Sequence, residues 1–359
     1  MNMKAVEVAP NVLVYKSLDH SVFDFLKNYS KVCLLADENT KKHCYPLIKE
    51  YLPANHTVFQ IESGEENKNL KTCELIWQFL TDESVDRKSI LINLGGGVIG
   101  DMGGFCAATF KRGIDFVQMP TTLLSQVDAS VGGKLGIDFK GFKNHIGVFK
   151  MPRKVVVYPN FLNTLTDREL VSGYAEVVKH ALIKDKDHWK QLKKIEDLNQ
   201  IEWDVVIPHS IEIKADVVEE DPFEYGVRKI LNFGHTIGHA IESYFLEKGE
   251  NKLLHGEAIA VGMICESYLS LKKDLIDEHV LNNINKHFNT IFPIVSFTDE
   301  DIEHILPLVI QDKKNSHGKI NLSILKGAGT AIYDQEFSLE EIKESINYYR
   351  ENIPALNKN

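Results

Sequence analysis

Two histidines four residues apart are the clearest sign of chemistry in this sequence. On a helix, the spacing of His235 and His239 directs both imidazoles to the same side. A divalent metal needs a third ligand, which His255 or Glu176 can supply; Glu176 has an ion pair with Lys179 as its competing explanation. A histidine pair of this spacing also occurs without metal. The residues therefore indicate a zinc-type centre that polarises a substrate oxygen and leave its ligand set open.

A glycine-rich turn follows an apolar segment that reads as a buried strand. After Ser89–Leu94 the chain continues Gly95-Gly-Gly-Val-Ile-Gly-Asp101, which satisfies G-x-G-x-x-G. Such a turn lets the backbone and the following helix N-terminus approach a pyrophosphate, although it also serves simple strand-to-helix packing. Met119-Pro120 stands where an acidic ribose ligand is usual, so a variant nucleotide-binding fold is predicted. Asp37 is the alternative ribose ligand, with a solvated turn aspartate as its competing explanation.

A third cluster of polar residues lies in the glycine-rich segment 111–147. Lysine and arginine side chains within glycine-rich loops bind phosphate or carboxylate groups. A solvated basic face is the alternative, but here the charges are interleaved with glycine and apolar residues. The polar residues are Lys111, Arg112, Thr121, Thr122, Ser125, Asp128, Ser130, Lys134, Lys143 and Asn144.

Two kinds of pattern along the chain predict the elements that carry these residues. Short apolar or β-branched runs occur at Val12–Tyr15, Lys31–Ala36, His56–Ile61, Ser89–Leu94, Asp115–Met119 and Lys154–Val157, with helical patterns such as Asn69–Leu80 between them. Beyond Pro159 the spacing is helical, in a long segment around Glu176 and then at Val205–Glu220, Ile230–Leu246, His255–Lys273 and Asp277–Phe288. We expect an α/β nucleotide-binding domain over 1–160 with a mostly parallel sheet, and a mainly helical metal- and substrate-binding domain over 161–359.

Composition limits the partners of this protein. The 359 residues carry a net charge of −10, which argues against a nucleic-acid footprint. The start, MNMKAVEVAP, does not read as a signal peptide, and no apolar run is long enough to span a bilayer. The five cysteines are dispersed and odd in number, as in reduced thiols of packed segments. A cytoplasmic protein without membrane partners is predicted.

Taken together, these motifs resemble the 3-dehydroquinate synthase family. The resemblance rests on the glycine turn, PTTLLSQVD (120–128) with Gly-Gly-Lys134, Lys143-Asn144, GYAEVVK (173–179), NFGHTIGH (232–239) and HGEA (255–258), in that order. It implies a phosphate-eliminating lyase that uses NAD and a divalent metal, usually Zn²⁺ with Co²⁺ possible. The reaction converts 3-deoxy-D-arabino-heptulosonate 7-phosphate to 3-dehydroquinate and phosphate by transient oxidation, β-elimination, reduction and aldol closure, in the shikimate pathway.

The resemblance also assigns roles to individual residues. Metal ligands are implied at Glu176, His235 and His255, which leaves His239 to act on the substrate. Substrate contacts are implied for Asp128, Lys134, Lys143, Asn144, Lys179, Lys214, Arg228, Asn232 and His239. NAD contacts are implied for Asp37, Ser63, Gly64, Glu65, Lys68, Gly96, Gly97, Val98, Ile99, Gly100, Asp101, Thr121, Thr122, Lys134, Lys143, Phe161 and Thr164. Arg112 would reach the phosphate in a neighbouring subunit, so a homodimer is implied, and either Lys313 or Lys314 is a further candidate.

Three other functions compete with this interpretation. A metal-dependent polyol dehydrogenase would have little use for so many anion-binding residues. A related cyclase acting on another sugar phosphate is disfavoured by Arg228 and Lys214, which suit a substrate carboxylate. A non-catalytic NAD-binding protein is disfavoured because every candidate ligand is present.

Overall fold

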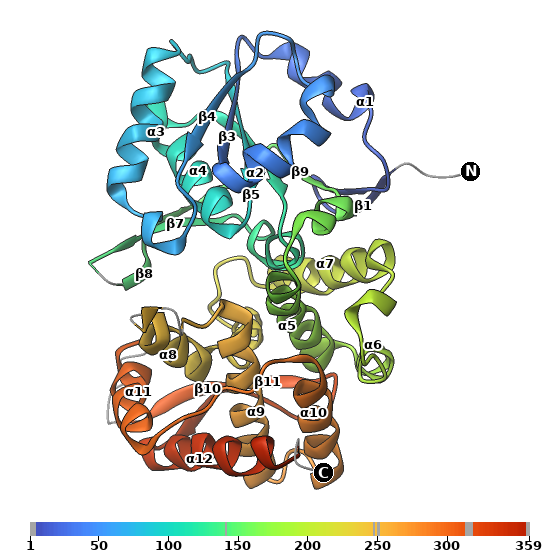
Figure 1. Ribbon diagram of the computed structural model, residues 1–359, viewed down its shortest axis with the longest axis vertical. Coiled ribbons are helices and arrows are strands. Elements are labelled where there is room, and N and C mark those ends of the chain that lie inside the picture. The colour runs from blue at the N-terminus through green and yellow to red at the C-terminus, as the bar shows by residue number, and fades with distance from the viewer. Residues whose placement is uncertain (1–4, 141, 247, 250–251, 313–318, 357–359) are drawn as a thin grey trace. The chain divides into compact units, whose positions relative to one another are not determined.

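The computed structural model describes residues 5–140, 142–246, 248–249, 252–312 and 319–356 (Figure 1). The chain divides into two compact units, Met1–Thr166 with Trp203–Ala215, and Asp167–Glu202 with Asp216–Asn359. The sequence places one boundary near residue 160. Trp203–Ala215, the first part of α7 (Trp203–Glu220), joins the first unit, where its Lys214 is bound to Asp128.

The first unit is built on a seven-stranded sheet that is parallel except at one edge. Its order is β1 (Ala5–Ala9), β2 (Val12–Tyr15), β9 (Lys154–Val157), β6 (Asp115–Pro120), β5 (Ile90–Gly95), β3 (Val32–Asp37) and β4 (Thr57–Ile61). Only β1 runs antiparallel, paired with β2. The α/β class with a mostly parallel sheet is confirmed, and β1 is the one strand of this sheet that the sequence patterns missed.

Both faces of this sheet are covered, which explains its continuous apolar strands. Leu34 and Ile92 point into a core with α1 (His20–Phe23) on one face. Their neighbours on the strands, Cys33 and Leu91, point into the opposite core with α3 (Leu70–Asp82) and α4 (Gly97–Thr109). The sheet therefore lies between two layers of helices. The nucleotide motif lies where β5 ends and α4 begins (Figure 1).

Part of the glycine-rich segment is a hairpin and not a loop. β7 (Lys134–Phe139) pairs antiparallel with β8 (Phe142–Phe149), with a change of register between Ile137 and Phe139. Before it, Ser125–Ala129 forms a π-helical turn that holds Asp128. Lys134, at the start of β7, follows two glycines with positive φ, Gly132 at 102° and Gly133 at 64°. A hairpin rather than a flexible loop thus carries three candidate anion-binding residues.

The second unit is mainly helical, as predicted, with one small sheet. Its helices are α5 (Asp167–Lys184), α6 (Lys186–Leu192), the end of α7, α8 (His235–Leu246), α9 (His255–Lys272), α10 (Glu278–Ile291), α11 (Asp299–Asp312) and α12 (Leu339–Leu356). β10 (Ile320–Leu325) and β11 (Ala331–Phe337) pair antiparallel. α9 is buried on nearly all sides, which makes it the centre of this unit.

The helix expected over Ile230–Leu246 is interrupted. Val227–Asn232 is a 3₁₀ turn, and α8 begins only at His235. The break is at Gly234, whose φ of 78° suits glycine. His235 is consequently the first residue of its helix.

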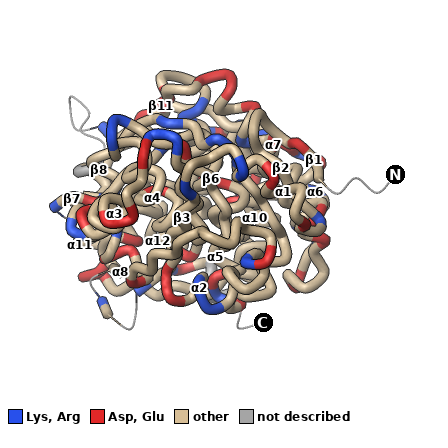
Figure 2. Tube along the Cα trace, turned by 90° about the horizontal axis from the view of Figure 1, so that it is seen from above, with Lys and Arg blue, Asp and Glu red and all other residues tan. Residues whose placement is uncertain are grey.

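Three further features concern the cysteines, the apolarity of the helices and the distribution of charge. All five cysteines are buried and free. In the part of the chain that is described, no helix has the length and apolarity to cross a membrane. Basic and acidic residues are interspersed along the trace in Figure 2.

Candidate active site

Four candidate residues of the second unit come together from three helices. α5 carries Glu176, α8 carries His235 and His239, and α9 begins with His255. The Nε2 atoms of His235 and His255 lie 3.4 and 3.6 Å from Glu176 Oε1. The ligating nitrogens of the three histidines lie within 4.8 Å of one another. This arrangement brings together both ligand sets that the sequence left open.

The Nδ1 atoms of two of these histidines are already engaged. His235 Nδ1 lies 3.0 Å from the Phe233 carbonyl oxygen, and His255 Nδ1 lies 3.2 Å from Glu242 Oε2. An Nδ1–H that donates to an oxygen leaves Nε2 with its lone pair free for a metal. Sequence reasoning missed Glu242, although it follows His235 by seven residues and so lies on the same face of α8.

The carboxylate of Glu176 is a suitable metal ligand. It is fully buried, Lys179 Nζ forms an ion pair with its Oε2, and its Oε1 faces the His235 and His255 imidazoles. Burial alone would raise its pKa, but Lys179 and His235 hold the pKa of Glu176 well below its usual range. An ionised buried carboxylate next to two imidazoles is a donor set that fits a divalent cation.

The two imidazoles have opposite protonation tendencies. Burial, followed by the charge of Lys179, lowers the pKa of His235 to about 4. Burial also acts to lower the pKa of His255, but the Glu242 and Glu176 carboxylates outweigh it and raise that pKa to about 9. His235 therefore offers a lone pair at neutral pH, and His255 holds a proton in the position where a metal ion fits.

Glycines allow the three helices to approach. A β-carbon on Gly256 would lie 1.8 Å from the Ser172 carbonyl oxygen of α5, and one on Gly262 would lie 2.0 Å from the Gly234 carbonyl oxygen before α8. Ser172 Oγ also accepts a hydrogen bond from Gly256 N at 3.0 Å. These close contacts place Glu176, one turn after Ser172, beside the start of α9.

Two further candidates of the second unit, Arg228 and Asn232, form hydrogen bonds with the segment just before them, at Pro222 and Glu224. Arg228 is buried and donates to the Pro222 carbonyl oxygen at 2.6 Å, and Asn232 donates to Glu224 Oε1 at 2.7 Å. The Asp221 carboxylate accepts hydrogen bonds from the backbone N–H groups of Tyr225, Gly226 and Arg228. Sequence reasoning missed Asp221 and Glu224, which follow the helical pattern at Val205–Glu220 and belong to none of the motifs.

In the first unit, the glycine turn is closely packed at Gly95, Gly96 and Gly100 and leaves space at Gly97. A β-carbon on Gly97 would meet only Ala129, at 3.6 Å, and the α4 N-terminus has no side-chain cap. Thr121 N donates to the Gly95 carbonyl oxygen at 3.0 Å, while its buried Oγ1 has no hydrogen-bond partner. Free backbone N–H groups and a buried hydroxyl are donors that fit a dinucleotide phosphate.

Asp37, the alternative ribose ligand, caps a helix in this structure. It ends β3 and caps α2 (Glu38–His43), and its Oδ1 accepts a hydrogen bond from Thr40 N at 2.7 Å. The next residue, Glu38, accepts from both N and Oγ of Ser63, which holds the segment from Ser63 to Lys68 beside this strand end. Gly64 in that segment has a φ of 111°.

A buried lysine joins cofactor candidates to a substrate candidate. Lys68 Nζ lies 2.7 Å from Asp101 Oδ2 and 2.6 Å from Asn144 Oδ1, and 3.9 Å from Glu65 Oε1. Asp138, at the register change of the hairpin, donates its N–H to the Lys68 carbonyl oxygen and accepts from Asn144 N. Asp138 is another residue that sequence reasoning missed, because a bulge is visible only once the strands pair.

Other candidates have simpler surroundings. Lys214 donates to the backbone carbonyl of Asp128 and lies 2.8 Å from Asp128 Oδ1. Lys134 and Arg112 are exposed, Lys143 is half-buried, and Arg112 has a φ of 67°.

Phe161 is buried in the core, where its carbonyl accepts from Thr164 Oγ1. Gly96 precedes α4, whose first residues include Val98, Ile99 and Gly100, and Thr122 bonds Ser125. Lys313 and Lys314 lie outside the described residues.

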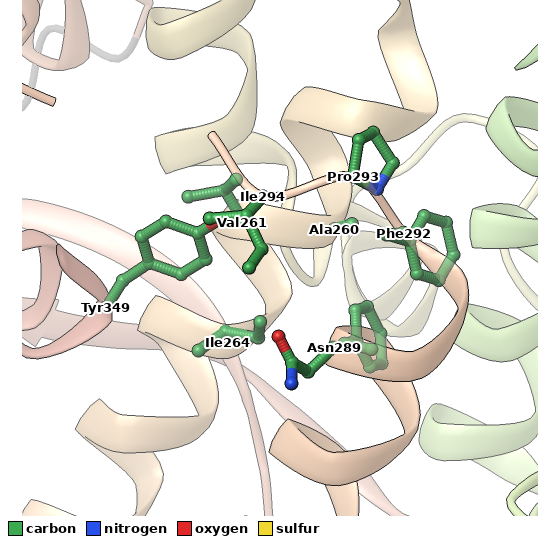
Figure 3. Close-up of a pocket in the computed structure, with 9 residues that line it drawn as sticks. Ala260, Val261, Ile264, Asn289, Phe292, Pro293, Ile294 and Tyr349 are labelled. Carbon is green, nitrogen blue, oxygen red and sulfur yellow. The ribbon is translucent and has the colours of Figure 1, made fainter. Parts of the chain in front are cut away.

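A small pocket elsewhere in the second unit has no such polar groups. Figure 3 shows that it lies among α9, α10 and α12, with one amide, Asn289, among apolar side chains. The other lining residues are Ala260, Val261, Ile264, Phe288, Phe292, Pro293, Ile294 and Tyr349. It has no charged side chain for an anion or a metal.

Known proteins of similar sequence cover most of this chain. The family models for the N-terminal and C-terminal parts of 3-dehydroquinate synthase match residues 58–172 and 173–315. The 3-dehydroquinate synthase of Parabacteroides distasonis is 41% identical over 348 residues, which cover 95% of this chain and 98% of that protein. That of Acetivibrio thermocellus is 41% identical over 318 residues, covering 86% and 87%.

Among solved structures, 2-deoxy-scyllo-inosose synthase complexed with carbaglucose-6-phosphate, NAD⁺ and Co²⁺ has a TM-score of 0.84. It is 24% identical, with 96% of this chain and 99% of that chain covered, and the TM-score shows that the two share a fold. The two family models and the two relatives together decide the family. This chain belongs to the 3-dehydroquinate synthase family.

Proposed function

We propose that the protein catalyses the reaction for which its family is named. It would convert 3-deoxy-D-arabino-heptulosonate 7-phosphate to 3-dehydroquinate and phosphate. The observation that carries this proposal is the convergence of Glu176, His235 and His255 with His239 beside them, in a chain of this family. A carboxylate and two imidazoles from three helices form a closed triad that leaves room for a substrate.

Two groups absent from the chain itself would complete the site. Glu176, His235 and His255 would hold Zn²⁺ or Co²⁺, and the strand ends around the glycine turn would hold NAD. When bound, the metal supplies a Lewis acid for substrate hydroxyl groups, and NAD supplies a reversible hydride acceptor. The open turn at Gly97 and the unpaired Thr121 hydroxyl support the NAD site.

The chain's own side chains would bind and orient an anionic substrate. Lys134, Lys143 and Asn144 would hold the phosphate, and Arg228 and Lys214 the carboxylate. Asp128 orients Lys214 through the ion pair at 2.8 Å. Lys179 and Asn232 would contact substrate hydroxyl groups.

Elimination then breaks the C–O bond to phosphate as the neighbouring C–H proton is lost. We assign the departing phosphate as the base for that proton, and His239 as a group that exchanges a proton with a substrate oxygen. Ring closure needs mainly a site that fixes one conformer.

Turnover is expected to release one phosphate per substrate with almost no net NADH. The oxidation serves only to make the phosphate a leaving group, so the hydride returns to the same molecule before product leaves. The measurement combines a phosphate assay with absorbance in the NADH band, in enzyme supplied with NAD and Zn²⁺.

A polyol dehydrogenase would behave differently in that assay. NADH would accumulate in step with product and no phosphate would appear, which would reject the proposal. Heptulosonate phosphate should be compared with a hexose phosphate, because a related cyclase would prefer the latter.

We also propose a homodimer in which Arg112 completes the phosphate site of the neighbouring subunit. Arg112 is exposed, in a turn where Lys111, Arg112 and Gly113 all have positive φ. A cytoplasmic location belongs to the same proposal, and five buried free cysteines fit a reducing compartment.

Mixed dimers test the role of Arg112. Arg112→Ala and His235→Ala homodimers should each be nearly inactive, whereas heterodimers of the two should recover up to about a quarter to half of wild-type activity, because one of their sites is intact. Differently tagged chains allow the heterodimer to be purified. Verified heterodimers without recovery would show that each site is built within one chain.

A further inference from the structure

A buried carboxylate lies at the N-terminus of the helix that carries the histidine pair. Glu266, on α9, is fully buried. Its Oε2 accepts a hydrogen bond from Gly234 N at 2.6 Å, and its Oε1 accepts one from Ile237 N at 3.4 Å. Gly234 directly precedes α8 and Ile237 lies in its first turn, where helical N–H groups lack partners within the helix.

This position suits a negative charge for two reasons. The N-terminus of a helix carries partial positive charge, which stabilises a carboxylate. A buried charge also requires hydrogen-bond partners, and the first turn of α8 supplies them. Glu266 thereby caps a helix that begins abruptly after the left-handed Gly234.

The residues fixed by Glu266 adjoin a proposed metal ligand. Gly234 precedes His235 directly, and the Phe233 carbonyl before it accepts the hydrogen bond from the His235 ring. A change in the backbone at Gly234 would therefore move both the Cα of His235 and the acceptor that orients its imidazole. The hydrogen bonds that Glu266 accepts from Gly234 and Ile237 come from backbone N–H groups, so through them Glu266 acts on His235 indirectly.

Glu266 and His255 are also linked through one helix. They are eleven residues apart on α9, which is about three turns, so both lie on the same face. α9 thus presents one ligand at its first residue and, further along, the group that fixes the start of α8. The separation between His255 and His235 depends on both contacts.

We propose that Glu266 is a positioning residue for the metal centre, which sets the orientation of His235 by capping α8. The inference rests on the proposed function, since it presumes that His235 binds a metal. A glutamine at this position keeps the shape but has only one acceptor oxygen and no charge, so the two N–H groups would no longer both be satisfied.

The test measures metal affinity and not turnover alone. Glu266→Gln should bind Zn²⁺ at least tenfold more weakly than wild type in a chelator competition, which is the usual effect of losing an outer-shell partner. The KM for NAD should stay unchanged, because NAD is assigned to the first unit. Glu266→Asp, which keeps the charge but shortens the side chain, should fold and show a smaller loss of affinity.

Ser270→Ala is the matched control. Ser270 lies one turn further along α9, is fully buried, donates its hydroxyl to the Glu266 backbone carbonyl and accepts a hydrogen bond from Leu325 N. Its loss removes a buried hydroxyl but not the Glu266 carboxylate, so it should lower thermal stability without changing Zn²⁺ affinity. If the Gln or Asp variant binds Zn²⁺ as wild type does and loses only stability, Glu266 is merely structural. If wild type itself binds no metal, the proposed metal centre fails and the inference fails with it.

Discussion

Replacing His239 with alanine is expected to leave the metal in place and to reduce kcat by about 10²–10⁴-fold, the usual contribution of a proton-transfer group. His235→Ala is expected to lose both metal and turnover. The expectation follows from the proposed roles, and it is supported by the Nε2 atoms of His235 and His255, which lie 3.4 and 3.6 Å from Glu176 Oε1. His239 is placed beside them, as the ring distances of 5.1 and 5.7 Å to His235 and His255 show.

The experiment separates two ligand sets that the geometry brings together. In a three-histidine site, His239→Ala would lose metal and Glu176→Gln would keep it. In the site proposed here, His239→Ala would keep the metal and Glu176→Gln would lose it. Metal content by elemental analysis after gel filtration, measured beside phosphate release, decides between them. The exposed His279→Ala serves as a control, with metal and turnover both expected at wild-type values.

Helical spacing explains why much of this centre was predictable from sequence. His235 and His239 are close in the chain, so the period of one helix fixes their relation. Glu242 lies on the same face and was within reach of the same argument. Spacing could not decide between Glu176 and His239 as a ligand, because Glu176 belongs to a different helix. That choice came from the resemblance to a family.

Contacts between elements explain what could not be predicted. The hairpin of β7 and β8 was read as a loop, since its glycines at 132, 133, 136 and 147 mask the strand pattern. At the break before α8, Gly234 N donates a hydrogen bond to Glu266, a residue far away in sequence. Asp138 and Asp221 bind backbone N–H groups whose positions only the folded chain defines.

Gly256→Ala is expected to have the largest effect on stability of any single methyl group added to this centre. The new β-carbon would lie 1.8 Å from the Ser172 carbonyl oxygen, 2.5 Å from its carbonyl carbon and 2.8 Å from its Cα. All three are backbone atoms of a helix, so no side-chain rotation can relieve the overlap. Moving α5 and α9 apart is the remaining solution, at a cost of about 3 kcal/mol or more.

That separation should be visible at the metal as well as in stability. Glu176 is one turn from Ser172 and His255 is the neighbour of Gly256, so these two proposed ligands would move apart with their helices. We expect the apparent Tm to fall by roughly 6 °C or more, and Zn²⁺ content to fall well below one ion per chain.

Ser267→Ala, on the same helix, provides the comparison. It removes a buried hydroxyl that has no hydrogen-bond partner, so it should cost little stability and leave metal content unchanged. A Gly256→Ala protein with wild-type Tm and a full complement of metal would mean that α5 and α9 do not approach as closely as described. In that case the close packing of these helices would no longer explain how Glu176 and His255 are brought to one ion.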